Sequence, residues 1–401
     1  MISKDEALAL VLEHTPPGRE ISVDLAQCAG LTLAQPVLAD RDYPPFDRAM
    51  MDGYAVRLAD AGQPTRVVAE LRAGTSRADP IEPGTCVEIM TGAPCPPGTE
   101  AVVPREIVAR DGAHATAPTS ISAEMHIVRQ GRERRQGEEV LPAGAVLTPL
   151  ALGVAAAVGR DALQVFARPS LAVITTGDEL VQGAQVGPAQ IRNSNGPMLV
   201  AMARGLGITE ILQLHAVDSA QDLARALDRA AGYDLLVLTG GVSAGNYDLV
   251  PAALAAYGAT ERFHKVTQKP GKPLLFATRD EQLLFGLPGT PLGAHLGFHR
   301  YVTAALRAMQ GGRPRAHGCD RGTLTTALSV HGEREKFLLA SVEPGERGWS
   351  VSPLSGWGSS DLTSAATANA YLHMPAGEQQ LPAGATIDFE WTAGLPDGGR
   401  E

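Results

Sequence analysis

Residues 233–248 read YDLLVLTGGVSAGNYD and join an apolar run to a glycine-rich turn. The run at 234–239 is short and bounded by turn residues, which is typical of a strand buried on both faces. The glycines after it allow a sharp turn and close approach to a ligand, and successive backbone N–H groups there can bind an anion. Asp248 cannot hold an anion itself, so a carboxylate beside such a loop indicates Mg²⁺ shared with a phosphate. Taken alone, the stretch also fits an ordinary strand-to-helix turn with a capping Asp.

The same pattern recurs along the neighbouring sequence. Further buried strands are predicted within 171–180, 208–217 and 283–291, and each ends in turn residues or a carboxylate. Three lysines, Lys265, Lys269 and Lys272, surround the turn Pro270-Gly271. Strands that alternate with helical patterns predict a parallel sheet, whose ligands bind beyond the carboxyl ends of the strands. We therefore expect these loops, carboxylates and lysines to form one site.

Length and composition bound the class of protein. A chain of 401 residues predicts two to four domains. Its formal charge of −10, without a basic block, argues against a nucleic-acid surface. The sequence shows neither a signal peptide nor an apolar run of about 18 residues that would span a membrane. The four cysteines lack CxxC spacing, so we expect a soluble, reduced, cytoplasmic protein.

The order of patterns predicts an α/β multidomain chain. A small N-terminal α+β domain is expected to be discontinuous, built from residues 1–42 and 139–167. Short β-type runs punctuated by Pro, Gly and Asp at 43–138 predict a β-rich domain inserted into it. The α/β domain with the parallel-type sheet occupies 168–311, and 312–401 returns to short β runs.

Eight motifs carry a resemblance across nearly the whole chain. In order they are PPFDRAMMDGYAV (44–56), EIMTGAPCPPGTEAVVP (88–104), RQGEE (135–139), TTGDEL (175–180), IRNSN (191–195), TGGVSAGNYD (239–248), KPGKP (269–273) and GLPGTP (286–291). With these motifs the chain resembles the molybdopterin molybdenumtransferase family, which includes bacterial molybdenum-insertion enzymes and the E domain of gephyrin.

The resemblance implies a fold and an activity. The family's fold has four domains in an elongated homodimer, with a central domain similar to molybdopterin-binding adenylyltransferases. The implied reaction inserts molybdate into adenylylated molybdopterin and releases AMP with Mg²⁺, in the last step of molybdenum cofactor synthesis. The implied pocket lies between the α/β domain of one subunit and the inserted domain of the other. A molybdopterin adenylyltransferase is an expected partner protein, and neither nucleic acid nor membrane is.

The resemblance also implies site residues. Positions with expected catalytic roles are Asp52, Thr91, Glu139, Glu179, Asp218, Asp248, Lys265, Lys269 and Ser359. Positions expected to bind the molybdopterin substrate are Gly240, Gly241, Ser243, Gly245, Pro270, Gly271 and Lys272. Lysines are suitable point-charge partners for molybdate and pyrophosphate. Asp218 and Asp248 are the expected Mg²⁺ ligands, because carboxylate oxygens suit a hard cation.

Three positions depart from the family pattern. Glu139 stands where the family usually has Asp, and Thr290 where Asn is common in GLPGNP. Leu339 stands where the family usually has an Arg, two positions beyond a Phe. That Arg is expected near molybdate, so its absence predicts weak molybdate binding unless Arg334 or Lys336 substitutes for it.

Two other functions fit parts of the sequence. The central domain alone would suit the preceding adenylyltransferase, although the additional β domains and the MDGYA segment argue against it. Leu339 would suit a non-catalytic binding or scaffold relative.

Overall fold

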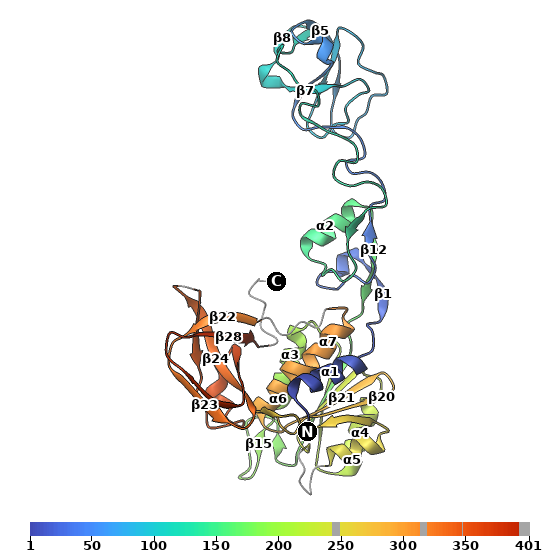
Figure 1. The fold of residues 1–401 in the computed structure, drawn as a ribbon. Coiled ribbons are helices and arrows are strands. Elements are labelled where there is room, and N and C mark those ends of the chain that lie inside the picture. Colours follow the sequence, from blue (N-terminus) through green and yellow to red (C-terminus); the bar gives the residue numbers. More distant parts are fainter. Residues whose placement is uncertain (243–248, 313–318, 347, 393–401) are drawn as a thin grey trace. The chain divides into compact units, whose positions relative to one another are not determined.

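A computed structural model describes residues 1–242, 249–312, 319–346 and 348–392 (Figure 1). The chain divides into two compact units. One comprises Met1–Ser22, Gly30–Ala34 and Gln164–Glu401, and the other comprises Val23–Ala29 and Gln35–Leu163. The finer four-part division stays a prediction. No helix in the described ranges is long and apolar enough to cross a membrane.

A six-stranded mixed sheet forms the centre of the first unit. Its strands, in spatial order, are β16 (Ile211–Ala216), β13 (Leu171–Thr176), β17 (Leu235–Thr239), β21 (Gln282–Leu287), β20 (Leu275–Arg279) and β18 (Thr260–His264). The first four are parallel, which confirms the predicted sheet. β20 runs antiparallel to both of its neighbours, β21 and β18. Only Asp280 and Glu281 join β20 to β21, and parallel neighbours need a longer crossover.

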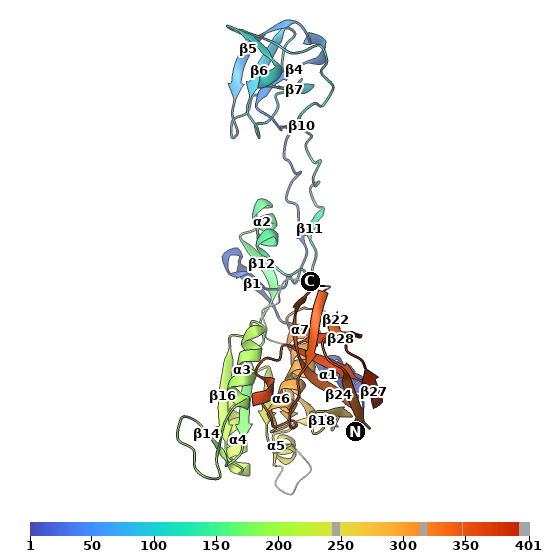
Figure 2. The same ribbon diagram turned by 90° about the vertical axis from the view of Figure 1, so that its left-hand side faces the viewer.

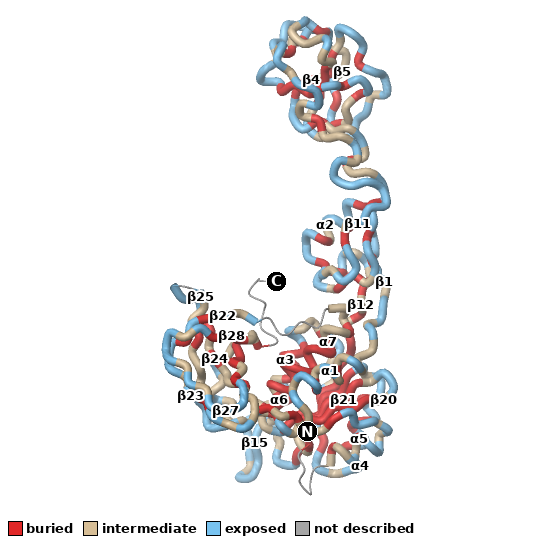
Figure 3. Tube along the Cα trace, viewed as in Figure 1, coloured by how far each residue is buried: buried red, intermediate tan, exposed pale blue. Residues whose placement is uncertain are grey.

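Helices cover both faces of this sheet (Figure 2). Leu171 and Val173 face a core built with α1 (Lys4–His14), α3 (Asn195–Gly205), α6 (Pro291–Gly297), the π-helix η4 (Phe298–Val302) and α7 (Thr303–Met309). Ala172 and Ile174 face the opposite core, built with α4 (Ala220–Arg229) and α5 (Val250–Ala256). Successive strand residues point to opposite faces, so a strand covered on both sides is apolar throughout. Figure 3 shows the resulting band of buried residues through the sheet.

The C-terminal strands close into a small barrel. β24 (Glu335–Gly345), β25 (Gly348–Pro353), β22 (Cys319–Leu324), β28 (Thr386–Trp391) and β26 (Ala370–Met374) follow one another, and β26 pairs back with β24. A sixth strand, β19 (Gln268–Lys269), comes from the lysine-rich segment of the α/β region and pairs with β24. β23 (Leu328–Gly332) and β27 (Gly377–Leu381) form a separate pair. The predicted C-terminal β structure is therefore confirmed.

The second unit centres on another six-stranded sheet. Its strands, in spatial order, are β7 (Ala101–Pro104), β4 (Gly53–Val56), β6 (Thr85–Ile89), β5 (Pro64–Leu71), β9 (His114–Thr116) and β8 (Ala109–Asp111). Apolar residues form a core on each face. The unit also holds α2 (Pro149–Ala157) and two short strand pairs, β2 (Val37–Leu38) with β11 (Glu139–Leu141) and β3 (Arg48–Ala49) with β10 (Ile127–Val128).

We predict that Gly53→Ala destabilises the second unit. A Cβ at Gly53 would lie 2.0 Å from the Val103 carbonyl oxygen on the paired strand β7, and backbone cannot move aside cheaply. The expected loss is roughly 2–4 kcal/mol of unfolding free energy, measured by calorimetry of the full chain. The matched control is Gly153→Ala in helix α2, where a Cβ meets nothing within 4 Å and the change should be neutral or stabilising. Equal unfolding temperatures for the two variants would contradict this account.

Candidate active site

Side-chain hydrogen bonds tie together the carboxyl ends of the central strands. Asn195, the first residue of α3, donates from Nδ2 to Thr239 Oγ1 and to the Gly289 carbonyl, both at 2.9 Å. Thr239 Oγ1 in turn donates to the Pro288 carbonyl at 2.9 Å. The loops after β17 and β21 are thereby held at one edge of the sheet, as the parallel order requires.

Gly240 makes the close approach of these loops possible. Its φ is +103°, and a Cβ there would lie 2.7 Å from the Thr176 carbonyl oxygen at the end of β13. Gly241 has a φ of +61°, also in the region that favours glycine. The two glycines occupy the strand-to-loop turn that the sequence predicts. Ser243, Gly245 and Asp248 lie outside the described residues.

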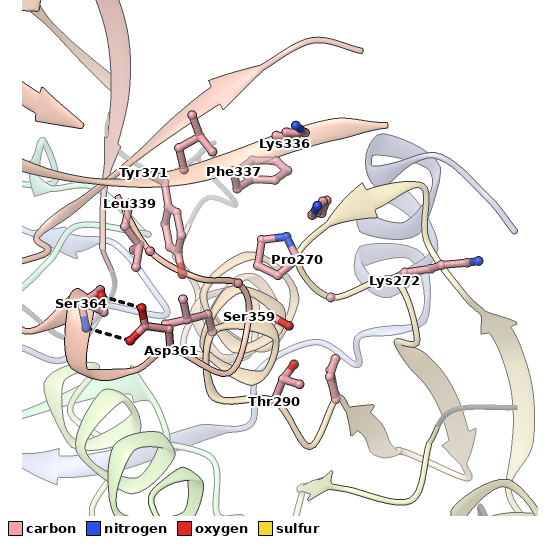
Figure 4. Close-up of a pocket in the computed structure, with 18 of the residues that line it drawn as sticks. Pro270, Lys272, Thr290, Lys336, Phe337, Leu339, Ser359, Asp361, Ser364 and Tyr371 are labelled. Carbon is pink, nitrogen blue, oxygen red and sulfur yellow. Dashed lines mark hydrogen bonds between the residues drawn. The ribbon is translucent and has the colours of Figure 1, made fainter. Parts of the chain in front are cut away.

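A cleft of about 800 Å³ lies beside this edge, between the loops and the C-terminal barrel (Figure 4). The barrel contributes Phe337 and Leu339 from β24 and Tyr371 from β26. Figure 4 shows these side chains facing Pro270, Ser359 and Thr290. Predicted site residues that line the cleft are Gly241, Lys269, Pro270, Gly271, Lys272 and Ser359. Their convergence comes from three separate segments of the sequence.

Lys265 is not among the residues that line this cleft. Its backbone N–H donates to the Leu274 carbonyl at 2.8 Å, and its carbonyl accepts from the Ile2 N–H at 3.2 Å. Its φ of +76° turns the chain between β18 and β19. The backbone of Lys265 thus helps to shape the segment that leads to the cleft, and its expected catalytic role stays a prediction.

The cleft is strongly cationic. Its basic lining residues are Lys269, Lys272, Arg334 and Lys336, and Asp361 is the sole carboxylate among its described lining residues. Asp361 is engaged by its own loop, where it accepts from Trp357 N at 3.0 Å, Thr363 Oγ1 at 2.9 Å, and Ser364 Oγ and N at 2.5 and 3.2 Å. The hydrogen bond from the Ser364 hydroxyl contributes most to holding the pKa of Asp361 well below its usual range. Asp361 therefore fixes the loop that carries Ser359.

Three carboxylates gather after β13 and β16. The Asp218 N–H donates to Asp178 Oδ1 at 3.0 Å, and Glu179 bends back over Gly177, where a Cβ would lie 2.5 Å from Glu179 Oε2. Partial desolvation, followed by the negative charges of Asp178 and Glu179, raises the pKa of Asp218. Within the described ranges, no three potential ligands converge closely enough to hold a metal.

The second unit brings two other predicted residues together. Asp52 Oδ1 accepts from the Thr91 backbone N–H at 2.8 Å and from Thr91 Oγ1 at 2.7 Å. The backbone hydrogen bond and then the hydroxyl lower the pKa of Asp52, so it is a carboxylate with a fixed orientation. Glu139 begins the short strand β11 and is exposed. The pairing of Asp52 with Thr91 spans 39 positions of sequence.

Several lining residues have no motif in the sequence. Tyr371 is buried against the cleft, and its hydroxyl lies 2.7 Å from His295 Nδ1 of α6. Phe337 and Tyr371 pack with Leu296 and Leu339 between α6 and the barrel. Alternating apolar and polar residues along β24 and β26 indicate strands there, but they do not show which face of the strands meets the α/β region. The sequence around Asp361 is rich in Gly and Ser and does not identify Asp361 as a residue of the cleft.

Comparisons with known proteins match most of the chain. Family models described as "MoeA N-terminal region (domain I and II)", "Probable molybdopterin binding domain" and "MoeA C-terminal region (domain IV)" match residues 2–159, 172–308 and 321–391. A protein of Staphylococcus epidermidis named molybdopterin molybdenumtransferase is 30% identical over 396 residues, covering 96% of this chain and 94% of that protein. One of the same name from Bacillus subtilis is 30% identical over 400 residues, covering 96% and 93%.

A solved structure supports the same assignment. The molybdopterin biosynthesis MoeA protein from Pyrococcus horikoshii superposes with a TM-score of 0.85 at 26% identity, covering 98% of this chain and 99% of that one. The full-length matches agree with the eight motifs, the central α/β sheet and the C-terminal barrel. The chain belongs to the molybdopterin molybdenumtransferase family of enzymes.

Proposed function

We propose that this chain inserts molybdate into adenylylated molybdopterin and releases AMP in a Mg²⁺-dependent reaction. The observation that carries the proposal is the cationic cleft at the carboxyl ends of the parallel strands, in a chain that matches molybdopterin molybdenumtransferases along its length. Its volume of about 800 Å³ falls in the usual range for small-molecule sites. Both proposed substrates are anionic, so they complement the charge of the lining.

The lining residues suit distinct parts of these substrates. Gly241 lines the cleft and can offer its backbone N–H to a phosphate, whereas the Gly240 N–H donates to the Leu287 carbonyl at 3.2 Å. Lys269 and Lys272 supply positive charge in the same cleft. Ser359 and Thr290 present hydroxyl groups in the same cleft (Figure 4). The Ser359 carbonyl accepts from Leu292 N at 3.0 Å, which fixes this loop to α6. Hydrogen-bond donors that are already held in place lose less conformational entropy when the ligand binds.

We propose that the carboxylates after β13 and β16 take part in binding a magnesium ion. Oxygen ligands are those that Mg²⁺ prefers. Partial desolvation, and after it the negative charges of Asp178 and Glu179, raise the pKa of Asp218, and a bound cation would offset both effects. We propose Asp218 and Asp248 as the ligands, with Asp178 and Glu179 adding negative charge nearby. When bound, the ion would neutralise charge that develops on the phosphoanhydride.

We further propose a cytoplasmic homodimer that receives its substrate from a molybdopterin adenylyltransferase. The family resemblance implies that residues of two subunits combine in one pocket. The ordered Asp52–Thr91 pair supports a functional role in the second unit, because a carboxylate held by two donors has a defined direction.

Asp248→Asn should abolish Mg²⁺-dependent AMP release, because a neutral amide replaces an anionic metal ligand. The unfolding temperature should stay unchanged. Asp218→Asn should raise the Mg²⁺ concentration needed for half-maximal rate. The control is Asp228→Asn on helix α4, which should leave the Mg²⁺ dependence unaltered. Wild-type Mg²⁺ dependence in Asp248→Asn would contradict the proposed ligand.

Asp218→Asn should also stabilise the metal-free protein slightly at pH 7. A carboxyl pKa that is raised in the folded state means that ionisation opposes folding above that pKa, and the penalty disappears as the pH falls through it. The carboxylate is exposed, so the expected gain is small, roughly 0.2–1 kcal/mol. Thermal unfolding between pH 7 and pH 4 without Mg²⁺ tests this, and a gain that grows toward acid pH would contradict it.

Mixed dimers test the shared pocket. An Asp52→Ala chain and an Asp248→Asn chain should each be inactive, whereas a mixed dimer should regain part of the AMP-releasing activity in one restored site. Tandem affinity tags isolate the mixed species. Mixed dimers as inactive as either parent would show that each site lies within one chain.

A further inference from the structure

Two lysines are paired where a strand of the α/β region joins the C-terminal barrel. β19 pairs with β24 in parallel, and Lys269 is the register partner of Lys336. Like charges directly opposite on paired strands are destabilising. Both lysines line the cleft, so the repulsion is concentrated where a ligand would bind.

No acidic residue neutralises this charge in the described part of the chain. None of its carboxylates lies within 4.0 Å of a cationic nitrogen of Lys269, Lys336 or Arg334. Glu335, which stands between two of them in sequence, instead lies 3.5 Å from Lys4 Nζ and 3.3 Å from His373 Nε2. Asp361 is already engaged by its own loop. A ligand anion is the counter-charge that this group of cations lacks.

Arg334 is held in place by the core. One guanidinium nitrogen, Nη1, donates to the Gln268 carbonyl at 3.2 Å. Gln268 is fully buried, and its Oε1 accepts from the Tyr301 hydroxyl at 2.7 Å. A guanidinium has five N–H donors in a planar fork, so this bond leaves donors free for a second partner.

Lys336 is held less firmly. Its ammonium group donates to the His331 carbonyl, a neutral acceptor near the end of β23. An anion is a stronger partner for an ammonium group than a carbonyl is. Lys336 can therefore exchange this contact for a ligand oxygen.

We propose that Arg334 and Lys336 of the β24 segment, together with Lys269, form the oxyanion-binding subsite of this cleft. The ligand class is a doubly charged tetrahedral oxyanion, with molybdate as the candidate that rests on the proposed function. The two β24 cations supply the donors that an Arg at position 339 would otherwise provide. Leu339 lines the same cleft and packs with Phe337 and Tyr371 in the apolar layer behind it.

The test compares Lys336→Met and Arg334→Met with Lys336→Arg in the full-length protein. Met keeps most of the aliphatic volume but removes the charge, and Lys336→Arg keeps the charge. Dissociation constants for molybdate, inorganic phosphate and AMP are measured by titration calorimetry at fixed ionic strength. The matched control is Arg321→Met, which removes an exposed barrel cation that pairs with Asp388 outside the cleft. Unfolding temperatures establish that every variant is folded.

Each Met variant should weaken oxyanion binding about ten- to a hundredfold, while Lys336→Arg and Arg321→Met change it less than threefold. Loss confined to molybdate identifies it as the ligand, whereas loss confined to phosphate and AMP assigns the subsite to the substrate's phosphate. Leu339→Arg in the wild-type background should change affinity little, because the donors are already present. Unchanged oxyanion affinity in the folded Met variants, or a tenfold tightening by Leu339→Arg, would overturn the inference.

The proposed function fails separately from this inference. If the wild-type chain releases no AMP from adenylylated molybdopterin but both Met variants lose oxyanion affinity, the inferred subsite is supported and the proposed reaction is wrong. If the chain releases AMP and both Met variants keep the wild-type molybdate dependence, the proposed reaction is supported and the inferred subsite is wrong.

Discussion

The pairing of β19 with β24 is the contact on which the candidate site depends. It consists of Gln268 opposite Glu335 and Lys269 opposite Lys336, and it joins a loop of the α/β region to the C-terminal barrel. Backbone hydrogen bonds fix register to a single residue, and a slip of one position would turn the lysines to the other face. The Gln268–Tyr301 hydrogen bond anchors the same short strand in the core. The cleft is lined by residues from both sides of this junction.

The candidate site carries a cost to folding. Lys269 and Lys336 place like charges at register-paired positions, and partial desolvation together with the charges of Asp178 and Glu179 raises the pKa of Asp218. Clusters of like charge reduce the stability of the folded protein unless a ligand of opposite charge binds. The cationic lining of the cleft suits an anionic ligand, and a cation near the carboxylates would offset their charge. The apolar layers on both faces of the central sheet supply the stability that offsets these clusters.

Departures from the family pattern fall at positions that the fold tolerates. Leu339 packs with Phe337 and Tyr371, so an apolar side chain is well accommodated where the family usually has Arg. Glu139 is exposed on a short strand, where one extra methylene meets little constraint. Thr290 precedes α6 and keeps a hydroxyl group in the cleft. The architecture is therefore preserved while the chemistry of the cleft lining changes.

The sequence by itself determined the α/β core and the loops that carry the chemistry. Apolar runs such as 235–239 followed by glycine identify buried parallel strands, and their ends must meet at one edge. The sequence also singled out Asp52 and Thr91, although only the fold shows the hydrogen bonds between them. Tertiary structure alone decided that Arg334 and Lys336 stand beside Lys269, because pairing between distant short strands depends on register and packing rather than on local propensity. It also showed that Lys265 has a φ of +76° and that Lys269 and Lys272 line the cleft, since spacing along a loop does not fix its backbone conformation.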